Sequence, residues 1–312
     1  MKNIFVNSTE QRLRTGWRIL IFIFIFWAFA SLIFLIKPLL GDITKREYLQ
    51  NYSLIIVSIL TLGASIAVPL ARKILDKRSF VSLGLKANKK SFQDILFGFF
   101  LSGLMAAVFF TLMIGLGYVE FNGFNFDNSN GVTESSFNFV QFMSVISIGS
   151  MLLLLLEHIL VGYWEELVFR GYLLQNLSDG LGIITAIVIS CVIYGLIHYT
   201  NPNASLLSSS IIVLFGFLRI FGYLATKMLW LSIGMHIGWN FFQGPIFGFA
   251  ASGHKKATLI NQTITSNQDY LTGGEFGPEG SLWIIPILIL TFYVMRWYGK
   301  VNYPKVKYLE SE

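Results

Sequence analysis

The stretch EELVFR, residues 165–170, follows a largely apolar run over residues 151–164. Carboxylates and a guanidinium beside membrane-compatible sequence are costly to bury, so they require partners or a function. On a helix, Glu166 and Arg170 are four residues apart with the acid on the N-terminal side, which is the favourable order for an ion pair. Glu165 lies about 100° around the helix from Glu166. The stretch therefore predicts that Glu166 is neutralised and that Glu165 is available for chemistry.

The composition defines the class of protein. Of 312 residues, 54% are hydrophobic and 13% are charged, and the mean hydropathy is +0.63. Soluble domains carry about 25% charged residues, so the chain is an integral membrane protein. The net charge of +6 reflects topology rather than nucleic-acid binding, because Lys and Arg beside membrane spans set orientation. The single cysteine, Cys191, excludes an intrachain disulfide.

Eight apolar stretches approach the roughly 20 residues that a helix needs to cross a bilayer. They cover residues 19–39, 53–71, 94–117, 142–164, 182–199, 209–225, 229–249 and 281–298. The first imitates a secretory signal, but its apolar core is too long, so we read it as an uncleaved anchor. Residues 118–141 and 251–280 are expected to be flexible polar connectors. We predict one integral membrane domain over residues 1–312, an all-α polytopic bundle of about eight transmembrane helices.

The distribution of Lys and Arg predicts the orientation of this bundle. If the N-terminus is cytoplasmic, the inner segments hold most of these residues. The outer side then holds only Lys37, Lys45, Arg46, Lys255 and Lys256. This asymmetry places both termini in the cytoplasm, as an even number of spans also requires. We expect a multi-pass protein of the bacterial plasma membrane.

Further polar residues stand in apolar surroundings downstream. His198 ends an apolar run, and Tyr194 precedes it by one helical turn. An antiparallel hairpin turning at Gly180, at ~1.5 Å per residue, would bring Glu165 and His198 to a similar depth. We therefore expect the helix that carries Glu165 to continue to about Leu177.

A third polar pair lies on the seventh predicted span. His236 and Asn240 are four residues apart, so they share one helical face. Gly234 and Gly238 form a small-xxx-small pattern that permits close helix approach. Taken alone, a membrane histidine or asparagine is more often a structural hydrogen-bonding group, and Glu166 with Arg170 is more often structural as well. The combination at one depth points instead to a functional site.

Two kinds of hydrolytic chemistry suit this set of residues. Glu165 and His198 could deprotonate a water, while His236 and Asn240 donate hydrogen bonds to an oxyanion. Alternatively, Glu165, His198 and His236 match the ligand set of a catalytic zinc ion with one open position. The residues leave open whether zinc or no cofactor is used.

Three motifs now carry a family resemblance: EExxxR at Glu165–Arg170, aromatic-xxx-His at Tyr194–His198, and HxxxN at His236–Asn240. Together they resemble the CPBP (CAAX protease and bacteriocin-processing, or Abi) family, which includes the type II CAAX prenyl endopeptidases. The resemblance covers about residues 140–245, the protease-like core. One departure is Tyr194, where Phe is usual.

The resemblance implies an endopeptidase, often labelled a metalloprotease, acting on a peptide or protein substrate in or at the lipid bilayer. It implies Glu165 and His198 as the water-activating pair and His236 with Asn240 at the oxyanion. Glu166, Arg170 and Tyr194 would support them. Prenylated CAAX ends, bacteriocin leaders and other signal peptides are all open as substrates, and no oligomeric state is assigned.

Two other functions compete with proteolysis. A non-catalytic membrane scaffold or regulator could use the same fold to bind another membrane protein. A proton-coupled transporter could also use buried Glu and His. Transporters are often built from repeated halves, and no repeat is found in the sequence. We favour the protease, with the scaffold as the alternative.

Overall fold

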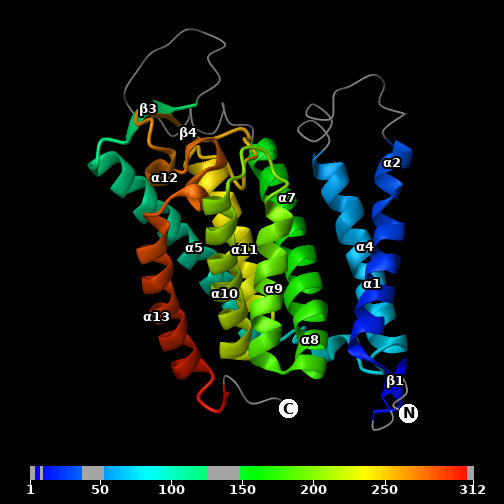
Figure 1. Ribbon diagram of the computed structural model, residues 1–312. Coiled ribbons are helices and arrows are strands. Elements are labelled where there is room, and N and C mark those ends of the chain that lie inside the picture. The colour runs from blue at the N-terminus through cyan, green and yellow to red at the C-terminus, as the bar shows by residue number, and fades with distance from the viewer. Residues whose placement is uncertain (1–3, 8–9, 37–52, 126–147, 308–312) are drawn as a thin grey trace.

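The computed structural model describes residues 4–7, 10–36, 53–125 and 148–307. Long helices run up and down through the molecule, so the predicted all-α membrane bundle is confirmed (Figure 1). The principal helices are α1 (Thr15–Ala30), α2 (Leu32–Ile36), α4 (Ser53–Ile74), α5 (Lys89–Gly115), α7 (Ile148–Glu166), α8 (Leu174–Leu181), α9 (Ile183–His198), α10 (Leu206–Thr226), α11 (Trp230–Phe241) and α13 (Ile284–Asn302).

Shorter elements join these helices. They are the strands β1 (Val6–Asn7), β2 (Arg12–Leu13), β3 (Val119–Phe124) and β4 (Ile260–Ile264), the short helix α12 (Asp269–Thr272), the 3₁₀ turns η2 (Phe80–Leu83), η5 (Gly274–Phe276) and η6 (Pro278–Gly280), and the π-helical segments η3 (Leu167–Leu173) and η4 (Phe242–Ile246).

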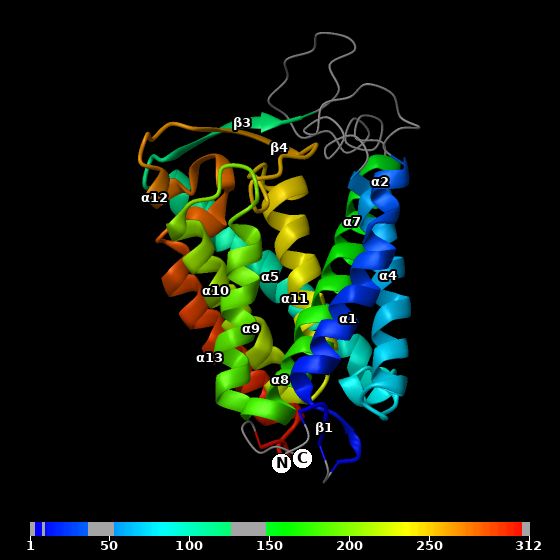
Figure 2. The same cartoon turned by 45° about the vertical axis from the view of Figure 1, so that its right-hand side comes forward.

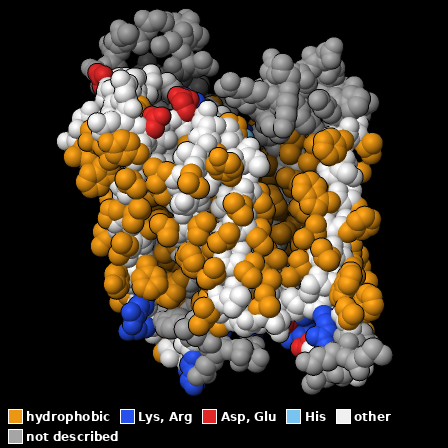
Figure 3. All heavy atoms as spheres, viewed as in Figure 1, with side chains coloured by type: hydrophobic (Ala, Val, Ile, Leu, Met, Phe, Trp, Pro, Cys, Tyr) orange, Lys and Arg blue, Asp and Glu red, His pale blue; other side chains and the backbone are white. Residues whose placement is uncertain are grey.

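The two ends of the bundle differ in charge. One end, here called the basic end, holds β1, α8 and the end of α13 (Figure 2). It carries Arg12, Arg14, Arg18, Arg72, Lys73, Lys77, Arg78, Lys86, Lys89, Lys90, Lys227, Arg296, Lys300, Lys305 and Lys307. The opposite end, here called the loop end, holds β3, β4 and residues 247–283, with two basic residues among those described, Lys255 and Lys256. A belt of apolar side chains separates the ends (Figure 3).

Within the part of the chain that the structure describes, five helical segments are long and apolar enough to cross a membrane: residues 15–35, α4, α5, α10 and α13. The remaining predicted spans correspond to α9, which is shorter, and to α7 and α11, which run into the π-helical segments η3 and η4. The expected membrane bundle is thus present. The count of eight spans and the cytoplasmic location of the termini stay predictions.

The loop end is more regular than predicted. Strand β3 pairs antiparallel with β4, with Val119 opposite Ile264 and Phe121 opposite Gln262. The expectation of two flexible connectors is therefore wrong for the described parts of these loops, because hydrogen bonds between their backbones join them. Residues 126–141 of the first connector lie outside the described residues.

The helical hairpin around residue 180 follows the prediction closely. The helix that carries Glu165 continues through η3 and α8 to Leu181, a few residues beyond the expected end. Gly182, with a φ of 78°, then reverses the chain into α9. This left-handed conformation favours glycine because it has no Cβ. The turn thus falls at Gly182 rather than at Gly180.

Helix α11 packs directly against the backbone of α5. A Cβ atom at Gly234 would overlap the carbonyl oxygen of Ile95, and one at Gly238 would overlap that of Phe99. The predicted small-residue face is therefore confirmed as the site of close helix contact. Because residues 234 and 238 face α5, His236 between them points to a different side of α11.

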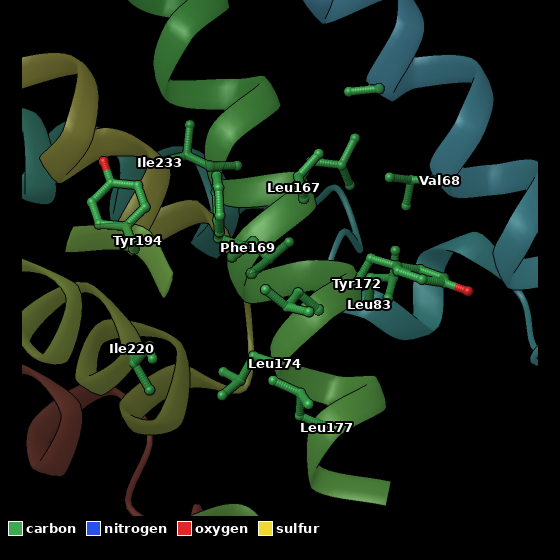
Figure 4. Close-up of a cluster of buried hydrophobic side chains, with 14 of the residues drawn as sticks. Val68, Leu83, Leu167, Phe169, Tyr172, Leu174, Leu177, Tyr194, Ile220 and Ile233 are labelled. Atoms are coloured by element: carbon green, nitrogen blue, oxygen red, sulfur yellow. The ribbon is translucent and has the colours of Figure 1, made fainter. Parts of the chain in front are cut away.

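Buried apolar side chains pack around η3 and α8 (Figure 4), which follow residue 165 along the chain toward the basic end. We call this cluster the apolar plug. It includes Val68, Leu83, Leu167, Phe169, Tyr172, Leu174, Leu177, Ile220 and Ile233, all of them buried. The plug joins η3 and α8 to α4, α10 and α11. It therefore forms a closed apolar layer between Glu165 and the basic end.

Candidate active site

The two adjacent glutamates have different environments. Glu166 is fully buried, and its Oε1 lies 2.9 Å from His236 Nδ1, 3.3 Å from Arg170 Nη1 and 3.9 Å from Arg219 Nη1. The predicted ion pair between Glu166 and Arg170 is therefore present. The Glu165 side chain keeps 13% of its surface exposed and lines a cavity. One carboxylate is enclosed by cations and the other faces open space.

Tyr194 links Glu165 to a second arginine. The Tyr194 hydroxyl donates a hydrogen bond to Glu165 Oε2 at 2.8 Å, and Arg219 Nη1 donates to the same hydroxyl oxygen at 2.6 Å. The guanidinium of Arg170 lies 4.2 Å from the centre of the Tyr194 ring. The hydroxyl that distinguishes Tyr194 from the usual Phe thus contacts the predicted catalytic carboxylate.

Arg219 is the residue of this site that sequence reasoning missed. It is 3% exposed, and its helix α10 has no acidic residue. A buried arginine without an acid on its own helix must find one on another helix. The absence of an acid on α10 is the sequence signal that could have indicated a partner among the buried glutamates.

His236 stands between the two glutamates. Its Nδ1 bonds Glu166, and its Nε2 lies 3.8 Å from Glu165 Oε2. Because Glu166 is surrounded by two arginines, it is an acceptor, and Nδ1 of His236 carries the hydrogen. Asn240, one helical turn further along α11, lines the same cavity.

His198 is oriented by the backbone of its own helix. Its Nδ1 lies 2.8 Å from the carbonyl oxygen of Tyr194. A carbonyl only accepts hydrogen bonds, so Nδ1 must donate and the neutral ring carries its lone pair on Nε2. His198 therefore presents a proton acceptor, which is the tautomer that a general base requires.

A cavity of about 330 Å³ gathers the predicted residues. Its wall includes Glu165 from α7, Tyr194 and His198 from α9, Arg219 from α10, and His236 and Asn240 from α11. The structure thus brings the four predicted catalytic residues to one space. Glu166 and Arg170 lie behind this wall and hold His236 and Tyr194.

His158 adds an unassigned polar group to the cavity wall. It lies two turns before Glu165 on α7 and is 5% exposed, and neither ring nitrogen has a hydrogen-bond partner among the described residues. Buried histidines are normally hydrogen-bonded, and His158 is an exception to which no role is assigned.

The donor atoms offer a partial fit to zinc. His198 and His236 each use Nδ1 for a supporting hydrogen bond, as histidine ligands of metals commonly do. However, no three His, Cys, Asp or Glu side chains in the described part of the chain stand close enough to hold a metal ion. The ligand set Glu165, His198 and His236 is therefore not assembled in this geometry, and it stays a prediction.

The fold and the cavity define a polytopic membrane protein with a buried site of carboxylates, histidines and an amide. Residues 147–242 match the family described as type II CAAX prenyl endopeptidase Rce1-like. The match spans α7 to α11 and contains all the predicted site residues. It confirms the resemblance to CPBP membrane proteases and supports peptidase activity at the level of the family. No curated protein matches the chain significantly.

Proposed function

We propose that this protein is an intramembrane endopeptidase that hydrolyses a peptide bond in a membrane-associated substrate. The observation that carries the proposal is the meeting of Glu165, His198, His236 and Asn240 on one cavity wall. These residues come from three helices, and the family match covers all of them. The proposed location is the bacterial plasma membrane.

Water activation is assigned to Glu165 and His198. Tyr194 holds Oε2 of Glu165, which leaves Oε1 to accept a hydrogen bond from water. The second hydrogen of the same water is accepted by Nε2 of His198, because Nδ1 is committed to the Tyr194 carbonyl. The water oxygen then attacks the carbonyl carbon while Glu165 takes its proton.

Oxyanion stabilisation is assigned to Asn240 and His236. The amide Nδ2 of Asn240 is a donor at any pH. His236 donates from Nε2 only when its ring carries both protons, since its first proton is held on Nδ1 by Glu166. Glu165 returns the abstracted proton to the leaving amine, so the peptide bond breaks and a carboxylic acid and an amine are released.

The first test compares wild type with Glu165→Ala in purified form. Both are assayed in detergent with a quenched peptide library. Loss of cleavage in Glu165→Ala, with retained folding, supports the proposal. The matched control is Glu275→Gln, because Glu275 is an exposed loop carboxylate paired with Lys255. Cleavage by Glu165→Ala at the wild-type rate would overturn the assignment of the base.

Zinc is tested in the same preparation by measuring bound metal and sensitivity to chelators. Cleavage that is unaffected by chelator, with no bound zinc, supports water activation by Glu165 and His198 alone. Stoichiometric zinc with chelator sensitivity supports the alternative ligand set Glu165, His198 and His236. A cellular phenotype rescued fully by Glu165→Ala would instead support the scaffold function.

A further inference from the structure

The cavity extends from the predicted catalytic residues toward the loop end. Its wall includes Ser53, the first residue of α4, together with Asn201 just after α9. It also includes Ser252 and Lys256, which belong to the loop-end segment after η4. Glu165 and His236 are the inner part of this wall. The cavity therefore continues from the middle of the bundle to the loop end.

The opposite direction is closed. The apolar plug fills the bundle between Glu165 and the basic end. Beyond the plug, Asp76 is buried between Arg18 and Arg72, with distances of 3.2 and 3.0 Å between the paired atoms. A peptide approaching from the basic end would have to displace both layers. The site is therefore reached from the loop end or from the membrane beside it.

The charge distribution assigns a side of the membrane to each end. The plugged end carries nearly all the Lys and Arg residues of the described chain. Basic residues beside membrane spans stay in the cytoplasm, so the basic end is cytoplasmic. The loop end and the cavity mouth then face the outside.

The wall between the mouth and Glu165 suits an extended peptide. Val57, Leu60 and Val161 offer an apolar surface for a side chain. The side chains of Asn201 and Asn240 add polar groups to the same wall. Backbone groups of a peptide drawn into the membrane need such partners, because lipid supplies none.

Given the proposed endopeptidase activity, we infer that the enzyme cleaves peptide segments presented from the outer face of the membrane. The substrate class is a translocated leader or signal-type segment that enters in extended form and has an apolar residue near the cleaved bond. A prenylated C-terminus held at the cytoplasmic surface does not belong to this class, because the plug separates that surface from Glu165.

Access is tested with single cysteines in a Cys191→Ser background, which removes the only native cysteine. Ser252→Cys places a thiol on the cavity wall, and Ala251→Cys at the adjacent lining position serves if the first variant accumulates poorly. Lys255→Cys marks the exposed loop end, and Lys89→Cys marks the basic end. Each is treated with a membrane-impermeant thiol reagent, on intact cells and on inverted membrane vesicles.

We expect Ser252→Cys and Lys255→Cys to react in intact cells, and Lys89→Cys to react only in inverted vesicles. Labelling of Ser252→Cys only in inverted vesicles would overturn the inference. Labelling of Lys255→Cys in intact cells, without labelling of Ser252→Cys or Ala251→Cys, would also overturn the inference. These readouts require no enzymatic activity, so they stand even if the proposed function fails.

The substrate side is tested in sealed proteoliposomes with the quenched peptide library added outside. Modification of Ser252→Cys by the impermeant reagent is expected to abolish cleavage, whereas modification of Lys89→Cys leaves it unchanged. Cleavage that survives at Ser252→Cys but is lost at Lys89→Cys would show access from the basic end and overturn the inference. If unmodified wild type cleaves no peptide while the cysteines are labelled as expected, the proposed protease activity is refuted. The inference that the cavity opens to the outside is then still supported.

Discussion

Two of the buried polar clusters among the described residues combine acids with arginines, and these two differ in structure. The cluster at the basic end is centred on Asp76, whose two carboxylate oxygens face Arg18 and Arg72. Tyr172 and Asn176 donate to the same carboxylate. Every charged group at its centre faces an opposite charge, and apolar side chains cover it.

The central cluster also combines acids and arginines, but one of its acids is turned away from them. Glu166 pairs with both arginines and with His236. Among the described residues, Glu165 contacts only the Tyr194 hydroxyl and His236, and it lines the cavity. The comparison teaches that burial of charge alone does not mark a site. The distinguishing feature is a charged group held in place on one side and open on the other.

Asp76→Asn is expected to have the largest effect on stability. It leaves the buried guanidinium groups of Arg18 and Arg72 without their carboxylate, and breaking such a buried pair costs about 3–5 kcal/mol. We expect a clear fall in thermal stability and accumulation, measured in detergent. Cleavage per folded molecule should be unchanged, because Asp76 is separated from the cavity by the plug.

The control for this variant is Glu275→Gln, which removes one partner of an exposed ion pair. Pairs of this kind contribute about 0–1 kcal/mol, so its stability should match wild type. If Asp76→Asn remained as stable as wild type but lost activity, the Asp76 cluster would be functional and not structural. The proposed difference between the two clusters would then be wrong.

Tyr194→Phe tests the central cluster with the residue that the family usually carries. It removes the hydrogen bonds to Glu165 and from Arg219 and keeps the ring that Arg170 covers. Hydrogen bonds to charged groups contribute about 1.5–3 kcal/mol, which corresponds to a roughly ten- to hundredfold loss of rate. We expect kcat to fall with little change in KM, because Tyr194 positions the base rather than the substrate.

Tyr199→Phe is the matched control. Tyr199 directly follows His198 but is 56% exposed, so this variant should behave as wild type. An unchanged kcat in Tyr194→Phe would mean that Glu165 is positioned without the hydroxyl. Equal losses of activity and stability would assign Tyr194 a structural role like that of Asp76.

The sequence was sufficient for the helical class of the fold and for contacts within one helix or one hairpin, for identifiable reasons. Apolar length predicts spans, and helical periodicity predicted the pairing of Glu166 with Arg170. Spacing around residue 180 predicted the hairpin. The sequence could not show that Arg219 contacts Tyr194. These residues lie on two different helices, and no spacing rule predicts which side chains of two helices meet.

Contacts between the loops were equally hard to predict from the sequence. The pairing of β3 with β4 depends on residues about 140 positions apart, and their polar, glycine-containing sequences carry no signal for this partner. His158 gives a second example of this limit. Its missing hydrogen bonds become visible only when the surrounding helices are in place.

Gly238→Ala tests whether the position of the central cluster matters apart from its chemistry. The added methyl group would overlap the Phe99 carbonyl oxygen and push α11 away from α5. Overpacking of this kind costs about 1–3 kcal/mol, and it moves His236 and Asn240 without altering them. We expect moderate destabilisation with a larger proportional loss of cleavage.

The control is Gly115→Ala, at the end of α5, where a Cβ meets no atom within 4 Å. Helix propensity makes this change neutral or stabilising by up to about 1 kcal/mol. If Gly238→Ala lost stability and kept full activity, α11 could move without disturbing the site, and the geometry proposed for the oxyanion would be wrong.

The smallest expected effect lies at the exposed edge of the basic-end cluster. Arg12 forms two hydrogen bonds with Glu10 and also reaches Asp179. The hydrogen bond from Arg12 is the main cause that holds the pKa of Glu10 below its usual value of 4.5. A carboxylate with a lowered pKa stabilises the folded state above its usual pKa, and this contribution disappears as the pH falls through the folded value.

Glu10→Gln should therefore lower stability by no more than about 1 kcal/mol near neutral pH, as expected for a partly exposed ion pair. The difference from wild type should shrink as the pH falls below about 4.5, measured by thermal unfolding in detergent across that range. A difference independent of pH would mean that Glu10 acts through packing rather than through its charge, because the hydrogen bond that it accepts from Asn7 can also be accepted by the Gln amide oxygen. In that case only the buried part of the cluster, around Asp76, depends on ion pairing.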